Sequence, residues 1–292
     1  MRYVYKKGDH YVNDDGKKVT DKRVLAQVQK IYIAPAYTEV KIDLDPKSKI
    51  LYTALDKGGK RQYFYKPFWN EAQDRKKFCK LIEFGEQMPK IKQDITKLLT
   101  TPGWSLDKLI AIQLQLMLLC NFRVGNEYSN KRTESVGIST LRGEHLVFKK
   151  ALIIEFIGKS HQLNRCELTE KRIVRLLNEL RARAGDGLLF VDDDGVHADS
   201  VRINNFLKQY GPFTSKEFRT WVANTVYIDS IKVAPDVKTA VKNVAEQLHH
   251  TTAICKKKYI HPALIELYHD TNRPPMKANA DKVFVTFLKE RC

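Results

Sequence analysis

The residues with the clearest chemical potential are a tyrosine, a histidine, two arginines and a lysine. Tyr259 follows three lysines, and His250 stands nine residues before it. Arg219, Lys159 and Arg123 lie farther upstream. Transfer of a phosphodiester to a tyrosine requires a hydroxyl nucleophile, donors for the charge on the non-bridging oxygens, and an acid for the departing oxygen. Singly, each of these residues is an ordinary surface or structural residue, so only the joint pattern favours catalysis.

The spacing of His250 and Tyr259 predicts a break in the helix between them. Nine residues on one continuous helix rotate by about 900°, which places the two side chains on opposite faces. A turn is therefore needed to bring them together. Thr251 and Thr252 are suitable helix caps, and they predict a new helix from Ala253.

The first part of the chain reads as short strands and turns. β-branched and aromatic runs are separated by turn sequences containing Gly, Asp and Pro. The expected strands cover residues 3–5, 10–12, 30–34, 39–44 and 50–55. Helical spacing of apolar residues begins after residue 69, so the domain boundary is placed near residue 72. The expected fold class is α+β, with a β-rich N-terminal domain at 1–72 and a larger, mainly helical domain at 73–292.

The larger part is expected to contain several helices and one β-hairpin. Two strand-like runs, at 151–157 and 162–168, place Lys159 on the turn between them. Ser105 can cap an apolar helix that extends to residue 120. Further amphipathic helices are expected after Thr169 and at 200–210, 215–229, 236–248 and 279–289.

Composition points to contact with a polyanion. The 51 basic and 34 acidic residues give a net charge of +17, which both parts of the chain share. Solubility does not require so much charge, so nucleic acid is the favoured partner and an anionic membrane surface is the alternative. The apolar runs are shorter than a bilayer span, and the N-terminus lacks the apolar region of a signal peptide. Five scattered cysteines argue against a disulfide framework and against a zinc site, and so favour a reducing intracellular compartment.

Several segments occur in the order found in one enzyme family. The chain resembles the short type IB DNA topoisomerases of poxviruses, other large DNA viruses and bacteria, which belong to the tyrosine recombinase superfamily. The resembling segments are GKRQYFY at 59–65, FRVGNEY at 122–128, SVGISTLR at 135–142, FIGKS at 156–160, KEFRTWVAN at 216–224 and HHTTAICKKKYIHP at 249–262. The resemblance covers residues from about 50 to 270. It implies a two-domain fold that forms a clamp on duplex DNA.

The resemblance also implies a role for each residue of the set. Tyr259 would attack DNA to form a 3′-phosphotyrosyl link, which conserves bond energy so that resealing needs no ATP. Arg123 and Arg219 would hold the non-bridging oxygens, and His250 would donate a further hydrogen bond. Lys159 would act as general acid, and no metal or other cofactor is required. The residues implied to contact DNA are Lys60, Arg61, Gln62, Tyr63, Tyr65 and, more weakly, Tyr128.

Two other functions stay open. A tyrosine recombinase would use the same five residues, although Lys216 stands where recombinases commonly carry His, and their helical core-binding domain is lacking. A DNA-binding clamp without chemistry would suit the charge and the aromatics. The resemblance favours the topoisomerase, acting as a monomer on double-stranded DNA without membrane contact. If the protein is viral, the expected location is the site of viral DNA replication or the virion.

Overall fold

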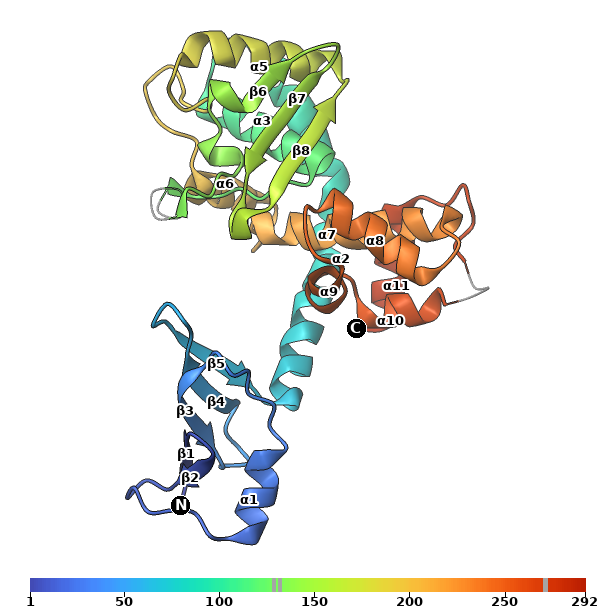
Figure 1. The fold of residues 1–292 in the computed structure, drawn as a ribbon. Helices are drawn as coiled ribbons and strands as arrows, with labels where there is room; N and C mark the ends of the chain where they lie inside the picture. The colour runs from blue at the N-terminus through green and yellow to red at the C-terminus, as the bar shows by residue number, and fades with distance from the viewer. Residues whose placement is uncertain (128–129, 131–132, 270–272) are drawn as a thin grey trace. The chain divides into compact units, whose positions relative to one another are not determined.

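The computed structural model describes every residue except 128–129, 131–132 and 270–272. The chain divides into two compact units, Met1–Lys77 and Phe78–Cys292 (Figure 1). The first unit carries a five-stranded sheet, and the second is mainly helical with a three-stranded sheet. The predicted α+β fold class is therefore confirmed.

The first unit is an antiparallel sheet in the order β2-β1-β3-β4-β5. Its strands are β1 (Tyr3–Lys7), β2 (His10–Val12), β3 (Thr38–Asp43), β4 (Ile50–Leu55) and β5 (Arg61–Tyr65). One face packs on helix α1 (Lys22–Gln29), and Val4, Val28 and Ile42 are buried between them. Because these residues pack against α1, the opposite face of the sheet is the one exposed to solvent.

Two predictions for this unit are wrong. The expected strand at 30–34 is an irregular segment, in which Ile31 and Ile33 pack against the core without joining the sheet. Helix α1, capped by Asp21, precedes this segment and was not expected. Val24, Leu25 and Val28 have helical spacing, so the signal for this helix was present in the sequence and was overlooked.

The second unit contains helices of very different lengths (Figure 1). These are α2 (Pro67–Leu98), which begins in the first unit, and α3 (Leu106–Cys120), α5 (Lys171–Ala184), α6 (Ser200–Leu207), α7 (Ser215–Val233), α8 (Val237–Gln247), α9 (Thr252–Ile254), α10 (Pro262–Leu267) and α11 (Ala280–Lys289). The boundary expected near residue 72 lies inside α2. Among the described helices, none is long and apolar enough to cross a membrane.

The predicted hairpin is confirmed, with one additional strand. β7 (Leu152–Ile157) pairs with β8 (Leu163–Leu168) along six residues, and β6 (Leu146–Phe148) pairs with the other side of β7. The tip of the hairpin is a short 3-10 turn, Lys159–His161. Ser160 and His161 have positive φ angles of 61° and 53° there. Lys159 is therefore on the turn, as expected.

Helices α2 and α7 approach each other closely at a glycine. A Cβ atom on Gly85 of α2 would lie 2.3 Å from the Trp221 ring of α7, so no larger residue fits. The Trp221 indole also donates to the Asp281 carboxylate at 2.9 Å. This packing fixes α7, the helix that carries Arg219.

The expectation of no disulfide is wrong for four of the five cysteines. Cys79 is bonded to Cys292, and Cys120 is bonded to Cys166. The partners are 213 and 46 residues apart, so no local spacing could reveal them. Cys255 is buried and free. The Cys120–Cys166 bridge joins the end of α3 to β8, the strand that follows the Lys159 turn.

Candidate active site

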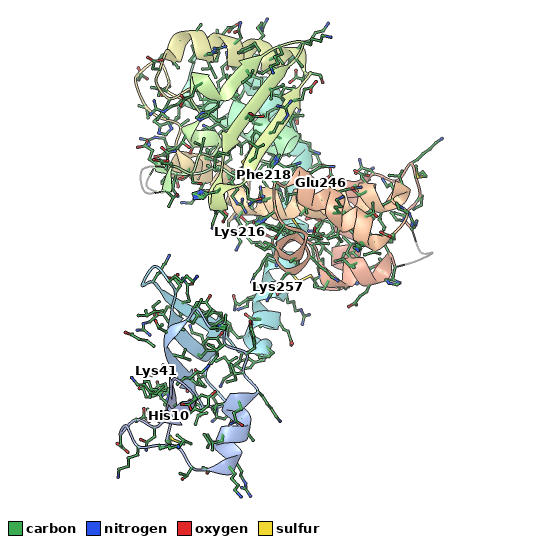
Figure 2. The ribbon with its side chains drawn as sticks, viewed as in Figure 1. His10, Lys41, Lys216, Phe218, Glu246 and Lys257 are labelled. Atoms are coloured by element: carbon green, nitrogen blue, oxygen red, sulfur yellow. A yellow bond between two sulfur atoms is a disulfide. The ribbon has the colours of Figure 1, made fainter. Side chains whose placement is uncertain are left out.

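The structure brings the five residues proposed for catalysis together in the second unit. Arg123, Lys159, Arg219 and Tyr259 line one pocket, and His250 contacts both Arg123 and Tyr259. They come from five different parts of the chain: the loop after α3, the hairpin turn, α7, the segment before α9 and the segment after it. Lys216 lies on α7 at the rim of the same pocket (Figure 2).

Arg219 is the most buried member of the site, with only 8% of the residue exposed. One terminal nitrogen donates to the Asn121 carbonyl at 2.6 Å and the other to the Leu248 carbonyl. Its Nε has no partner among the described residues. Burial, and then the charge of Arg123, lower the pKa of the guanidinium to about 10, so it stays charged at neutral pH. The two carbonyls fix the orientation of the Arg219 guanidinium. Its remaining N–H groups can donate to an anion.

Arg123 lies on a loop that backbone contacts hold in place. Helix α3 ends at Asn121, whose φ of 56° turns the chain into this loop. The Arg123 carbonyl accepts from the Ile138 amide at 2.9 Å. Gly125 and Gly137 touch along their backbones, since a Cβ on Gly137 would lie 2.5 Å from the Gly125 backbone. The loop therefore has little freedom to move away from the pocket.

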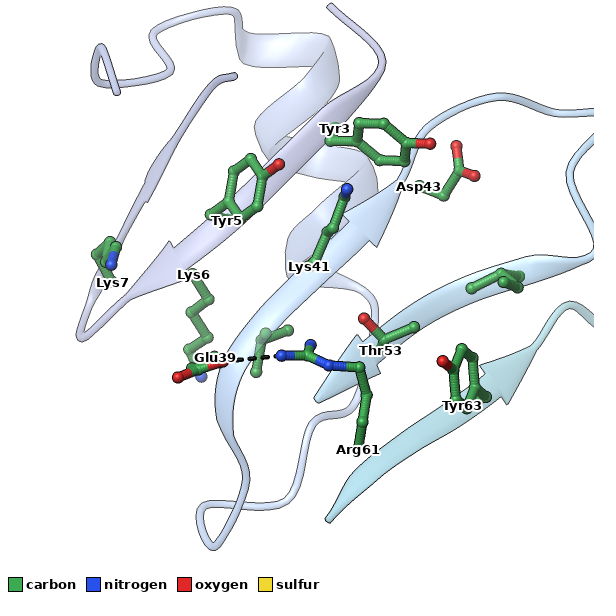
Figure 3. Close-up of a pocket in the computed structure, with 12 residues that line it drawn as sticks. Tyr3, Tyr5, Lys6, Lys7, Glu39, Lys41, Asp43, Thr53, Arg61 and Tyr63 are labelled. Atoms are coloured by element: carbon green, nitrogen blue, oxygen red, sulfur yellow. Dashed lines mark hydrogen bonds and ion pairs between the residues drawn. The ribbon is translucent and has the colours of Figure 1, made fainter. Parts of the chain in front are cut away.

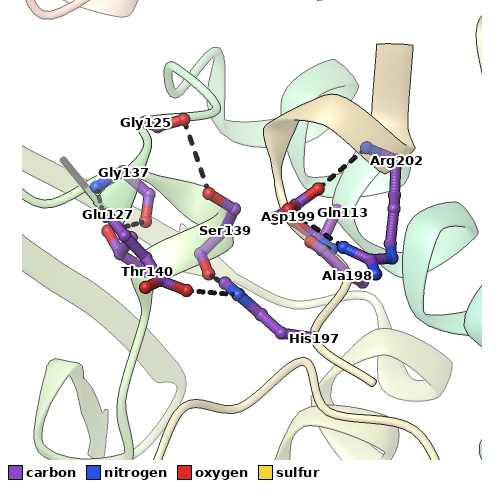
Figure 4. A network of polar contacts seen from close by, with 10 residues as sticks. All are labelled: Gln113, Gly125, Glu127, Gly137, Ser139, Thr140, His197, Ala198, Asp199 and Arg202. Carbon is purple, nitrogen blue, oxygen red and sulfur yellow. Dashed lines mark hydrogen bonds and ion pairs between the residues drawn. The ribbon is translucent and has the colours of Figure 1, made fainter. Parts of the chain in front are cut away.

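A histidine network supports the same loop from the other side (Figure 4). His197 contacts the Glu127 carboxylate through Nδ1 at 2.8 Å and the Ser139 carbonyl through Nε2 at 2.7 Å. The Ser139 amide in turn donates to the Val124 carbonyl at 2.8 Å, next to Arg123. Sequence reasoning missed His197, because no local pattern connects it with a loop some 70 residues away.

The His250 ring is neutral at ordinary pH and lies between Thr251 and Arg123. The Thr251 amide lies 3.1 Å from its Nδ1. Burial first, and then the charges of Arg123, Arg219 and Lys159, lower the pKa of His250 to about 4. Nε2 lies 2.7 Å from an Arg123 terminal nitrogen. Because a guanidinium can only donate, Nε2 accepts this hydrogen bond from Arg123.

The lowered pKa of His250 predicts an effect on stability. The folded protein favours the neutral ring, while the ring in the unfolded chain titrates near 6.5. The contribution of the neutral His250 ring to the free energy of unfolding is therefore fully present above about pH 6.5. It is lost as the pH falls toward 4. We expect the thermal midpoint to fall more steeply between these pH values in the wild type than in His250→Gln. If the thermal midpoints of wild type and His250→Gln fell in parallel with pH, this buried, neutral environment of His250 would be contradicted.

His249 does not share this geometry. Its Nε2 donates to the Cys120 carbonyl at 3.2 Å, and its ring lies 5.2 Å from that of Phe122. Burial lowers the pKa of this histidine as well. His249 therefore has a packing role beneath the pocket, which agrees with the preference for His250.

Tyr259 ends a π-helical segment, Cys255–Tyr259, that follows α9. The predicted break is confirmed, because Thr251 caps a new helix that starts at Thr252. The Tyr259 hydroxyl lies 3.5 Å from an Arg123 terminal nitrogen, and the Arg219 guanidinium lies 5.3 Å from its ring centre. Burial opposes ionisation, but the charges and hydrogen bonds of the two arginines outweigh it and lower the pKa of the phenol. This is the environment of an activated nucleophile.

Asn224 fixes the backbone at Tyr259 and was not assigned a role from the sequence. Its amide nitrogen donates to the Tyr259 carbonyl at 2.9 Å and to the Thr220 carbonyl at 2.7 Å. Its Oδ1 accepts from the His261 amide at 2.8 Å, and the residue is fully buried. It therefore holds the chain on both sides of Ile260. No sequence signal distinguishes such an asparagine from a polar residue packed on a helix.

Asn224→Ala should slow DNA cleavage without weakening DNA binding. The substitution removes both hydrogen bonds that hold the backbone around Tyr259, and a displacement of the nucleophile by about 1 Å can cost about 10²-fold in rate. The measurement is the single-turnover cleavage rate at saturating enzyme, beside the Kd for the same duplex. Asn224→Asp keeps the acceptor for the His261 amide and should lie between wild type and Asn224→Ala. If Asn224→Ala weakened DNA binding by the same factor as it slowed cleavage, Asn224 would act on binding instead.

The first unit presents an exposed aromatic and basic face on its sheet (Figure 3). Lys41 lies over the rings of Tyr3 and Tyr5, at 3.7 and 5.7 Å from their centres. Tyr63 on β5 borders the same hollow and is 53% exposed. Arg61, also on this face, forms an ion pair with Glu39 at 2.8 Å. Sequence reasoning found the β5 residues but missed those of β1 and β3, which only the sheet order places beside them.

The other residues proposed to contact DNA do not all lie on the same face as Tyr63. Tyr65 is exposed on the same side of β5 as Tyr63. Gln62 points to the opposite side, and its amide donates to the Asp56 carboxylate at 2.7 Å. Lys60 is exposed at the β4–β5 turn. Tyr128 lies outside the described residues.

The second unit thus brings a tyrosine beside two arginines and a histidine, a set that is chemically able to take up a phosphodiester. The family model described as eukaryotic DNA topoisomerase I, catalytic core, matches residues 66–282, and the one described as bacterial DNA topoisomerase IB, N-terminal domain, matches residues 8–56. The chain belongs to the DNA topoisomerase I family, and to its type IB.

Individual relatives agree with this assignment. The DNA topoisomerase 1B of Acanthamoeba polyphaga mimivirus is 28% identical over 294 aligned positions, which cover 92% of this chain and 87% of that protein. The DNA topoisomerase 1B of Vaccinia virus is 23% identical over 244 positions, which cover 77% and 74%. The DNA topoisomerase 1 of Candida albicans is 25% identical over 181 positions, but these cover only 22% of that longer protein.

Proposed function

We propose that this protein relaxes supercoiled duplex DNA by cutting one strand through Tyr259, allowing the free end to swivel, and resealing the strand. The single observation that carries this proposal is the Tyr259 hydroxyl beside Arg123, with the pKa of the phenol lowered by the two arginines. Family membership supplies the substrate, double-stranded DNA.

The cleavage step uses each residue of the site. The Tyr259 hydroxyl gives its proton to solvent, because the two arginines stabilise the phenolate. Its oxygen bonds to phosphorus as the bond from phosphorus to the 5′-oxygen breaks, which leaves a 3′-phosphotyrosyl link. Arg123, Arg219 and His250 donate to the non-bridging oxygens, on which charge develops. Lys159, on the exposed hairpin turn, gives its proton to the departing 5′-oxygen.

Resealing is the reverse of this step. The 5′-hydroxyl attacks the phosphotyrosyl phosphorus and returns its proton to Lys159, and Tyr259 is released. The bond energy is kept in the covalent link, so the cycle consumes no ATP. Two guanidinium groups and an ammonium supply the positive charge that a metal ion supplies elsewhere.

The exposed face of the first unit supports DNA contact outside the cleavage site. Tyr63, Tyr65, Lys41 and Arg61 combine aromatic rings with positive charge on one side of the sheet. Such a face suits the phosphates and base edges of a duplex. DNA binding should weaken steeply with salt, since each neutralised phosphate releases counterions. The protein is proposed to act as a monomer.

Mapping the covalent link tests the proposal. The protein is mixed with a duplex that carries a label upstream of the cut, the reaction is stopped with denaturant, and the peptides are analysed by mass spectrometry. The expected adduct joins the 3′-phosphate to the peptide that contains Tyr259. A 5′-linked adduct, or an adduct on another tyrosine, would contradict it.

A further inference from the structure

His197 has two ring nitrogens that each face a hydrogen-bond acceptor (Figure 4). Nδ1 lies 2.8 Å from a carboxylate oxygen of Glu127, and Nε2 lies 2.7 Å from the carbonyl oxygen of Ser139. Both oxygens accept hydrogen bonds, and neither can donate one. A neutral imidazole carries a single N–H, so it would donate to one oxygen and turn a lone pair toward the other. Only the imidazolium cation forms both hydrogen bonds.

The backbone around His197 holds the ring between these two partners. His197 pairs with Val191 in an antiparallel bridge, and the amide of Ala198 donates to the Phe190 carbonyl at 2.7 Å. The side-chain amide of Gln113, on α3, donates to the Ala198 carbonyl at 2.8 Å. The His197 side chain is only 15% exposed. The ring therefore has little freedom to exchange either acceptor for water.

Both acceptors belong to segments that hold Arg123. Glu127 follows Arg123 by four residues in the chain. Ser139 is tied to the same loop by its amide, which donates to the carbonyl of Val124, the residue after Arg123, at 2.8 Å. The charged ring thus joins the chain on two sides of Arg123. If the ring lost one proton, one acceptor would face a lone pair, and one of the two connections would be broken.

The charged groups near His197 suit a cation. In the described part of the chain, the ionisable residues on the segments that pack around it are Arg123 and Glu127 on the loop after α3, Asp192, Asp193, Asp194 and Asp199 on its own segment, and Arg202 in the first turn of α6. The 3-10 turn Ile138–Thr140, which carries Ser139, has none. Of these groups, Glu127 contacts the ring, while Asp199 caps α6 and pairs with Arg202 at 3.0 Å. Carboxylates therefore outnumber guanidinium groups on these segments.

We propose that His197 is a positioning residue for DNA cleavage, which holds the Arg123 loop as an imidazolium through Glu127 and Ser139. This inference rests on the proposed function, because Arg123 serves the reaction by holding the phosphate that Tyr259 attacks. His197 does not line the Tyr259 pocket, so it acts through Arg123 and not on DNA. As the pH rises and the ring becomes neutral, the loop loses one connection. Cleavage should then slow, while DNA binding is kept.

The test follows cleavage as a function of pH. Single-turnover rates on one duplex, at saturating enzyme, are measured for wild type, His197→Gln, Glu127→Gln and His145→Gln. Dividing each variant rate by the wild-type rate at the same pH cancels the titration of the pocket residues, which all four proteins share. In parallel, the NMR chemical shifts of the two ring nitrogens of His197 report its protonation in the wild type.

His145→Gln is the matched control. The His145 side chain is also 15% exposed and does not line the pocket. Its Nδ1 accepts from the Arg142 amide at 2.9 Å, and burial lowers its pKa, so its ring is neutral.

Glu127→Gln separates the charge of His197 from its connections. The amide nitrogen of the new glutamine can donate to Nδ1, so a neutral His197 can keep both connections. This variant and the NMR measurement also stand if His197→Gln does not fold.

We expect both ring nitrogens of His197 to carry a proton at the lower pH values, and one proton to be lost as the pH rises. His197→Gln should cleave about tenfold more slowly than wild type while the ring is charged, and this difference should vanish with the same pH midpoint. Glu127→Gln should become faster than wild type above that midpoint, and the rate ratio for His145→Gln should not change with pH.

A ring that carries one proton at every pH, or a His197→Gln ratio that does not change with pH, would overturn the inference. Absence of cleavage by the wild type would instead count against the proposed function, since the NMR measurement needs no cleavage.

Discussion

Tyr259→Phe should bind duplex DNA normally and form no covalent adduct. The substitution removes only the hydroxyl, which is the nucleophile, and keeps the ring that packs against the core. Arg123, Arg219 and His250 still surround the phosphate, so Kd should change by no more than about twofold. The measurement is adduct formation on a labelled duplex, beside a binding titration of the same duplex. This is the largest effect expected from any single substitution in the chain.

Tyr268→Phe is the matched control. Tyr268 is a buried tyrosine whose pKa is raised by burial, and it lies outside the pocket. Its variant should keep cleavage close to the wild-type rate. Full activity of Tyr259→Phe would remove Tyr259 from the reaction, whatever the family membership. Loss of DNA binding by the same variant would mean that the hydroxyl has a structural role.

Lys159→Ala should slow cleavage by about 10² to 10⁴-fold on an ordinary duplex, the usual contribution of a general acid. The departing 5′-oxygen is a poor leaving group until it gains a proton. Replacing this oxygen by sulfur removes the requirement for a proton donor, because a thiolate departs unprotonated. On the sulfur substrate Lys159→Ala should lose less than about tenfold. Rates are measured in single-turnover cleavage of both duplexes.

Lys150→Ala provides the comparison for Lys159. Lys150 is exposed in the turn between β6 and β7 and does not line the pocket. Its variant should cleave both duplexes within about twofold of wild type. Equal losses for Lys159→Ala on the oxygen and sulfur substrates would assign Lys159 to phosphate contact instead of proton transfer.

The sequence predicted the parts of the fold that depend on local periodicity. The hairpin with Lys159 on its turn follows from two β-branched runs, and the break before Tyr259 follows from helical rotation. Both are present. The five residues proposed for catalysis also meet in one place, although they are far apart in the sequence.

Other features depend on contacts between distant segments and could not be predicted. The disulfides and the His197 support of the Arg123 loop join residues that no spacing connects. The hydrogen bonds of Asn224 require the exact path of the chain around Tyr259. Gln62 is a different case, because strand alternation, which is local, already puts its side chain on the face opposite Tyr63, although the resemblance groups it with the DNA-contacting tyrosines.

Relaxation of plasmid DNA tests the central claim most directly. Purified protein is incubated with negatively and with positively supercoiled plasmid, in EDTA and without ATP, beside Tyr259→Phe. The account predicts that wild type relaxes both substrates and that Tyr259→Phe relaxes neither. Relaxation of one sign only, a requirement for metal or ATP, or relaxation by Tyr259→Phe would contradict strand swivelling through a Tyr259 link.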